Sequence, residues 1–122
     1  MDAPINLHEA LATFDEPFQP RIVGTMNDYK LMVVKAHGEF VWHAHADTDD
    51  LILVLRGQLT VDLRDRQVTL GPGDLFVVPR GVEHRPRSEH GAELLLVEPA
   101  GTVNTGDGPA GEMTAPERPL GA

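Results

Sequence analysis

The feature that most constrains the fold is a succession of short runs rich in Val, Ile and Leu between residues 21 and 98. Glycine-rich or charged turns separate the runs, and no helical period interrupts them. Strands at this spacing are typical of a β-sandwich or barrel. The lack of intervening helices argues against parallel βαβ units. We therefore predict an all-β fold of eight or nine strands, in the runs 21–26, 29–36, 39–45, 50–56, 58–64, 67–70, 75–79, 82–87 and 92–98.

The two ends of the chain differ from this central part. Residues 6–14 carry apolar side chains at helical spacing, with Asn6 as the expected N-cap. Residues 1–20 are therefore expected to form a short helix and an arm, ahead of one barrel domain over 21–98. Residues 99–122 are rich in Gly and Pro and poor in large apolar side chains, which predicts an extended or partly mobile tail.

Composition excludes several classes of protein. A chain of 122 residues suits one domain, and the lack of cysteine excludes disulfides and thiolate metal sites. A formal charge of −9 argues against a nucleic-acid partner, which would need clustered Lys and Arg. The longest apolar stretch, 51–55, is too short to span a membrane. The first residues lack a basic start and an apolar run, so we expect a cytoplasmic protein.

Three histidines carry the candidate chemistry. His43 and His45 lie in a strand-like run, where residues i and i+2 point to the same side and could share one cation. An isolated pair of this kind is more often exposed to solvent on the protein surface. A metal site therefore needs a further ligand, and His84 is the candidate. Phe40 and Trp42 alternate with the pair and are expected to face the opposite side of the strand, in packing roles.

These histidines lie in two motifs that resemble those of the cupin family. The first cupin motif is Gly, five residues, His-x-His, three or four residues, Glu, six residues and Gly. The second is Gly, five residues, Pro-x-Gly, two residues, His, three residues and Asn. Here the first motif runs from Gly38 through His43, His45 and Asp50 to Gly57, and the second from Gly73 through Pro79, Gly81 and His84 to Ser88.

The chain departs from the cupin pattern at three positions. Gly38 is one residue closer to the first histidine, and Ser88 stands where the second motif has Asn. Asp50 replaces the usual Glu and reaches about 1.5 Å less, so the strand shifts inward, a water bridges the gap, or three histidines alone hold the ion. Asp49 fits the alternative three-residue spacing, but Asp50 keeps the six-residue separation from the turn glycine and is preferred.

The resemblance implies a double-stranded β-helix, or jelly-roll barrel, with a divalent metal near one mouth. The implied ligands are His43, His45, His84 and Asp50. Iron, manganese, nickel and zinc are all compatible with nitrogen and oxygen ligands. Gln58 and Arg80 are weaker candidates for substrate contact, each with a surface role as the alternative.

The family also implies a range of functions. Metal-dependent cupin enzymes include dioxygenases, isomerases, epimerases and lyases, and an enzyme of this kind acting on a small molecule is our first hypothesis. The alternatives are a non-catalytic module that binds or senses a small molecule or metal, and a barrel that has lost its metal. Both faces of 50–56 are apolar, which, with the habits of the family, favours a homodimer without a nucleic-acid or membrane partner.

Overall fold

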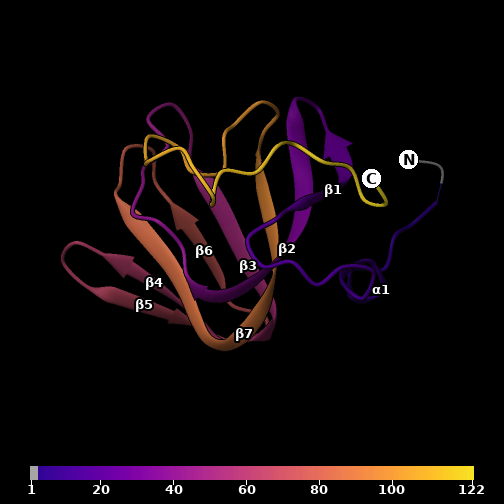
Figure 1. The fold of residues 1–122 in the computed structure, drawn as a ribbon, viewed down its shortest axis with the longest axis horizontal. Helices are drawn as coiled ribbons and strands as arrows, with labels where there is room; N and C mark the ends of the chain where they lie inside the picture. Colours follow the sequence, from indigo (N-terminus) through magenta and orange to yellow (C-terminus); the bar gives the residue numbers. More distant parts are fainter. Residues whose placement is uncertain (1–2) are drawn as a thin grey trace.

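The computed structural model describes residues 3–122 as one short helix and seven strands (Figure 1). Their order and bounds are α1 (Leu7–Leu11), β1 (Arg21–Met26), β2 (Tyr29–Glu39), β3 (Asp50–Gly57), β4 (Leu59–Leu63), β5 (Gln67–Leu70), β6 (Leu75–Val78) and β7 (His84–Pro99). Every pairing between these strands is antiparallel. The predicted all-β class with a short N-terminal helix is confirmed.

Strand β7 connects two parts of the barrel, the strands β3 and β6 and the strands β4 and β5. Its first residues, 84–87, pair with β4, and residues 92–97 pair with β3. Its other partner, β2, runs beside it for almost the whole length. The strand order is β1-β2-β7-β3-β6, and β4 also pairs with β5. As Figure 1 shows, β7 bends so that both parts curve around a shared interior.

Two predicted strand boundaries are wrong. The predicted strand 39–45 does not form, because β2 ends at Glu39 and the residues after it make only an isolated bridge between His43 and His84. The runs 82–87 and 92–98 belong to the single strand β7, because Gly91 continues the strand instead of ending it. Gly91 adopts φ +99°, and a Cβ on Gly57 would lie 2.2 Å from the Gly91 carbonyl oxygen. The glycine pair therefore permits a close crossing of two strands.

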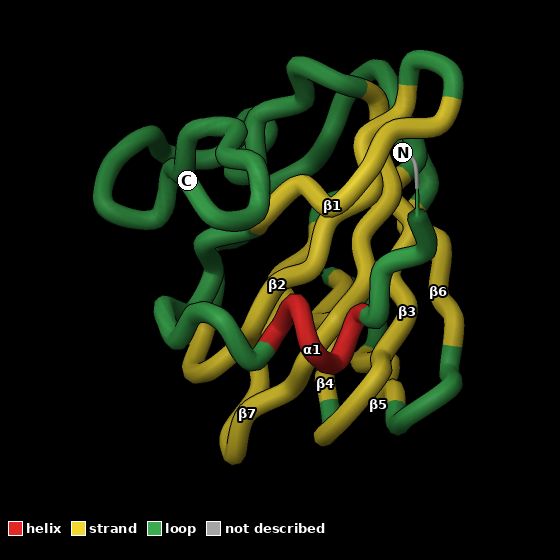
Figure 2. The backbone as a smooth tube through the Cα atoms, turned by 90° about the vertical axis from the view of Figure 1, so that its right-hand side faces the viewer, coloured by secondary structure: helices red, strands yellow, loops and turns green. Residues whose placement is uncertain are grey.

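Two hydrophobic clusters stabilise this arrangement. The larger one fills the barrel, where Val54, Leu59 and Val61 are fully buried. Figure 2 shows α1 beside β2. The smaller cluster joins these two elements, and its Leu11 and Val33 are fully buried. The helix begins as predicted, because the Asn6 side chain accepts a hydrogen bond from the Glu9 N–H at 2.9 Å. Leu55, within the segment 50–56 whose two faces are apolar, also packs against the smaller cluster.

The C-terminal segment, residues 101–122, contains no long strand and packs along the barrel (Figure 1). The Ile22 N–H donates to the Arg118 carbonyl at 2.7 Å, and the Leu120 N–H donates back to the Ile22 carbonyl at 2.9 Å. Thr105, earlier in the segment, is only 1% exposed. The segment is therefore extended and attached at both of these places. Within residues 3–122, no helix has the length and apolar character needed to cross a membrane.

Candidate metal centre

The fold brings the three predicted histidines together in the interior. His43, His45 and His84 are all buried, and their ligand atoms lie within 4.8 Å of one another. His43 follows β2 and His84 begins β7. The two residues exchange backbone hydrogen bonds of 2.9 and 3.0 Å across the isolated bridge. This bridge fixes one end of the His-x-His segment to the barrel wall without a regular strand.

Backbone carbonyls set the tautomer of two of these rings. The Nδ1 of His43 lies 2.9 Å from the Val41 carbonyl oxygen, and the Nδ1 of His84 lies 3.0 Å from the Val82 carbonyl oxygen. A carbonyl oxygen only accepts hydrogen bonds, so each Nδ1 carries the proton and each Nε2 keeps a free lone pair. Histidine ligands of metal sites are commonly oriented in this way.

Burial also keeps the three rings neutral. Burial and, to a smaller extent, the neighbouring imidazoles together lower the pKa of His45 and His84 to about 4. Burial lowers the pKa of His43 as well. A metal ion binds the neutral imidazole, so at neutral pH it would have no proton to displace from these rings.

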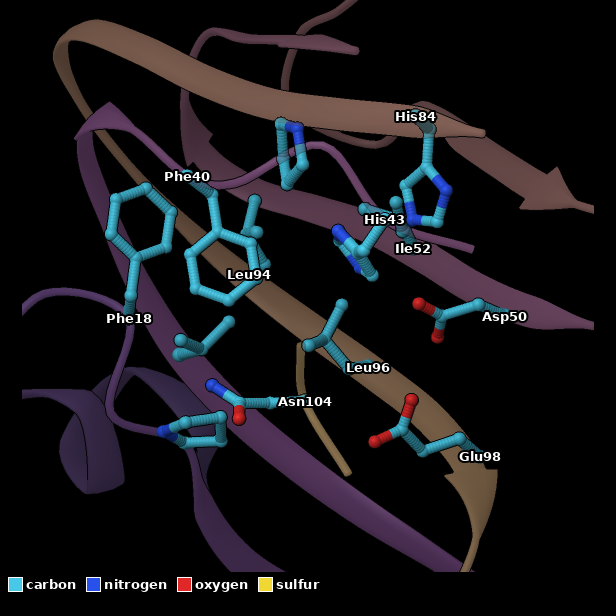
Figure 3. Close-up of a pocket in the computed structure, with 13 residues that line it drawn as sticks. Phe18, Phe40, His43, Asp50, Ile52, His84, Leu94, Leu96, Glu98 and Asn104 are labelled. Carbon is cyan, nitrogen blue, oxygen red and sulfur yellow. The ribbon is translucent and has the colours of Figure 1, made fainter. Parts of the chain in front are cut away.

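Two carboxylates complete the polar end of the site. Asp50, at the start of β3, is 6% exposed, and its Oδ2 lies 3.6 Å from His45 Nε2. Glu98, near the end of β7, is 3% exposed and points into the same space (Figure 3). Burial raises the pKa of Asp50 well above its usual value, and the Glu98 carboxylate raises it further. His45, Asp50 and Glu98 form a second group with ligand atoms within 4.8 Å of one another.

The other residues predicted for the site lie at the surface, outside the small cavity that adjoins the histidines. Asp49 is exposed, and its Oδ1 accepts the Arg80 N–H at 2.9 Å, so it supports the turn while Asp50 faces inward. Arg80 and Gln58 are also exposed, and neither is among the cavity-lining residues of the described chain. The Gln58 carbonyl instead accepts the Ser88 hydroxyl at 2.7 Å. Their roles in substrate contact remain predictions.

The cavity next to the histidines is small and has one apolar side. Its volume is about 60 Å³. Figure 3 shows Phe18 and Phe40 on one side, with Asp50 and Glu98 on the other. The expectation that Phe40 faces away from the histidines is wrong, because its ring meets the His43 ring edge-on at 5.3 Å. The segment is not a strand, so side chains in it do not alternate.

The C-terminal segment supports the His-x-His segment directly. The Asp107 side chain accepts the N–H of Ala44, which lies between the two histidines, at 2.6 Å. The Asp107 N–H donates to the Ala44 carbonyl at 3.0 Å. Gly106 adopts φ +52°, and a Cβ there would lie 2.3 Å from the Ala44 carbonyl oxygen. Only glycine allows this approach, and neither Asp107 nor Gly106 belongs to a motif seen in the sequence.

Comparison with protein families decides the classification. The family model described as "Cupin domain" matches residues 30–98, more than half of the chain. The chain is a cupin. This family match includes all three histidines, Asp50 and Glu98, and ends before the segment that carries Asp107.

Two relatives and one more distant structural neighbour are similar to this cupin. A cupin-2 domain containing protein from Shewanella frigidimarina NCIMB 400 is 41% identical, with a TM-score of 0.77 over 78% of this chain and 93% of that one. Uncharacterized protein YdbB of Bacillus subtilis (strain 168) is 36% identical over 62% of this chain and 68% of its own. Hydroquinone 1,2-dioxygenase from Sphingomonas sp. TTNP3 shares the fold at 22% identity, with a TM-score of 0.65 over 78% of this chain and 74% of that one.

The interior of this cupin fits a metal ion. Imidazole nitrogens and carboxylate oxygens suit divalent ions such as iron, manganese, nickel and zinc. The Oδ1 of Asp50 is buried without a hydrogen-bond partner, and buried polar atoms are normally paired. A cation would satisfy this oxygen, which makes the cluster a candidate metal site.

Proposed function

We propose that this cupin is a metal-dependent enzyme that acts on a small, oxygen-containing molecule in the barrel interior. The observation that carries the proposal is the arrangement of the three buried imidazoles. Two have Nδ1 hydrogen-bonded to a carbonyl, and burial favours the neutral form of all three. A structural core would gain more from apolar side chains of similar size, because unpaired buried polar groups cost stability.

The cavity limits the size and chemistry of the substrate. Its 60 Å³ would hold about four water molecules. The side formed by Phe18 and Phe40 favours an apolar group, and the side formed by Asp50 and Glu98 favours a hydroxyl or another hydrogen-bond donor. Asn104, from the C-terminal segment, also lines the cavity, so a larger substrate would require this segment to move.

The chain and the metal would have separate tasks. A bound divalent ion supplies a Lewis acid with open positions, which polarises an oxygen-containing ligand or activates oxygen or water. His43, His45 and His84 would hold the ion, and Asp50 would add a negative charge beside it. The apolar side of the cavity would orient the substrate and exclude bulk water.

The reaction type belongs to the group predicted from the sequence: dioxygenase, isomerase or epimerase, or lyase. The shared fold with hydroquinone 1,2-dioxygenase supports a dioxygenase as the first reaction to assay. Because one fold hosts many reactions, this likeness only orders the assays.

One observation favours a non-catalytic alternative. A cavity of about 60 Å³ is much smaller than the roughly 300–1,000 Å³ of most small-molecule sites. A protein that only binds or senses a metal would need no more space. Turnover of any small hydroxylated, carbonyl or carboxylate compound by the metal-loaded protein would refute this alternative.

Elemental analysis of untagged protein tests the metal site. We expect close to one ion per chain after incubation with Ni²⁺, which imidazole ligands suit, and loss of this nickel in His84→Ala. The matched control is His90→Ala, because His90 is exposed and belongs to neither motif. Full nickel retention in His84→Ala, or no metal in the wild type after incubation with iron, manganese, nickel and zinc, would contradict the proposal.

A further inference from the structure

Glu98 belongs to neither cupin motif, yet its carboxylate reaches the interior near His45 and Asp50. Figure 3 shows the Asp50 and Glu98 side chains extending from β3 and β7 into the same space. Together with His45, they form a second group of potential ligands. His45 is the only residue that this group shares with the three-histidine group. The interior therefore offers an ion two different sets of ligands.

The local charge supports a cation at the second set. Lys30 is 3% exposed and is the cation that lies near Glu98, with its Nζ 3.6 Å from Glu98 Oε1. The same Nζ lies 3.0 Å from Glu117 Oε2 and donates to the Thr102 carbonyl at 2.9 Å. One ammonium thus serves two glutamates and also acts on Asp50, whose nearest polar neighbours are the His45 imidazole and the Glu98 carboxylate. Buried carboxylates in this arrangement need a proton or a cation.

The unpartnered oxygen of Asp50 points to the same conclusion. Asp50 is 6% exposed, and its Oδ1 has no hydrogen-bond partner. Asp62 is the other described residue with such an oxygen, but its Oδ2 accepts bonds from Arg85 and Arg87 at 2.9 Å. Asp50 has no arginine of this kind, so its Oδ1 is left without a partner and is available to a ligand.

We propose that His45, Asp50 and Glu98 form a second cation position that prefers hard divalent ions such as Mn²⁺. This inference rests on the proposed metal-binding function and adds Glu98 to the site. His45 Nε2 faces Asp50 at 3.6 Å and can bind only one ion at a time. The two positions are therefore alternatives for a single ion, and the ion selects between them by its preference for nitrogen or oxygen ligands.

Metal titration of Glu98→Gln tests the proposal, with Mn²⁺ and Ni²⁺ as probes. Carboxylates suit Mn²⁺ and imidazoles suit Ni²⁺. We expect Mn²⁺ affinity to fall by at least about 10-fold and Ni²⁺ affinity to stay within a factor of about three of the wild type. Glu117→Gln is the matched control, because it removes a carboxylate from Lys30 without touching the site, and it should change neither affinity. An equal loss for both ions, or no loss, would overturn the proposal.

The double variant His43→Ala/His84→Ala provides an independent measurement. It removes two of the three histidines and leaves the second position intact. We expect it to lose Ni²⁺ binding and to keep Mn²⁺ binding at one ion per chain, and adding Glu98→Gln should then remove Mn²⁺. Loss of both ions in the double variant would overturn the second position but leave the three-histidine site standing. A wild type that binds neither ion would refute the proposed function as well.

Discussion

Asp50→Asn should stabilise the metal-free protein although it weakens metal binding. Asp50 is buried beside the Glu98 carboxylate, and its Oδ1 has no partner. Asparagine has the same shape and no charge, and its amide N–H can donate to Glu98. Removing an unsatisfied buried group of this kind is worth about 1–3 kcal/mol in the free energy of unfolding. For a domain of this size, each kcal/mol raises Tm by about 4 °C.

The effect should depend on pH in a defined direction. The pKa of Asp50 is raised in the folded protein, so between about pH 4 and that raised value the folded state binds more protons than the unfolded state. Wild-type stability therefore falls as pH rises through this window. The Asp50→Asn variant lacks this loss. Its advantage should be absent below about pH 4 and largest at neutral to alkaline pH.

Thermal or urea unfolding in the presence of a chelator, at several pH values, measures this difference. Asp62→Asn is the control, because Asp62 is also buried but is paired with Arg85 and Arg87, which lower its pKa. This control should lose stability at neutral pH where Asp50→Asn gains it. A metal-free Asp50→Asn protein that is no more stable than the wild type at pH 8 would refute the charge argument. Excess Mn²⁺ should reverse the order, because it stabilises only a protein that binds it.

Three further predictions concern the scaffold. Gly57→Ala should lower the free energy of unfolding in urea by several kcal/mol, since its Cβ would lie 2.2 Å from a backbone oxygen. Gly38 has the same φ of +80° but open space around it, so Gly38→Ala should cost only about 1 kcal/mol. Asp107→Ala should lower metal affinity about 10–100-fold in titrations, and Asp107→Asn should retain most of it, because it still accepts the Ala44 N–H. The homodimer expected from the sequence remains a prediction, and Leu75→Asp, on the exposed face of β6, should shift a dimer to monomer in light scattering.

The fold followed from local patterns in the sequence. Short apolar runs between turn glycines predicted the strands, and Asn6 with the apolar spacing after it predicted α1. The errors arose where tertiary contacts overrode local signals. Gly91 has the turn signal of a strand end, but it lies where β7 crosses Gly57 and its conformational freedom serves that contact. No periodicity in a single strand reports the position of a distant backbone.

The site was only partly predictable. The motifs indicated His43, His45, His84 and Asp50, because ligand spacing along the chain is a local property, and the structure brings these residues together. Glu98 had one signal, a charge at the end of the apolar run 92–98, which carries no information about its direction. No signal in the sequence predicted that the C-terminal segment would support the His-x-His segment. Its Gly and Pro residues predict an extended chain but do not indicate the surface on which that chain packs.

The length and position of β7 make the barrel and the metal site open together. His84 begins this 16-residue strand and Glu98 lies near its end, and the strand hydrogen-bonds to β2, β3 and β4 between them. Neither residue can leave the interior without breaking strand pairing, because His84 pairs with β4 and Glu98 pairs with β2. Amide hydrogens along β7 should therefore exchange with solvent only through near-complete unfolding. A bound ion should slow their exchange throughout the strand, including amides far from any ligand.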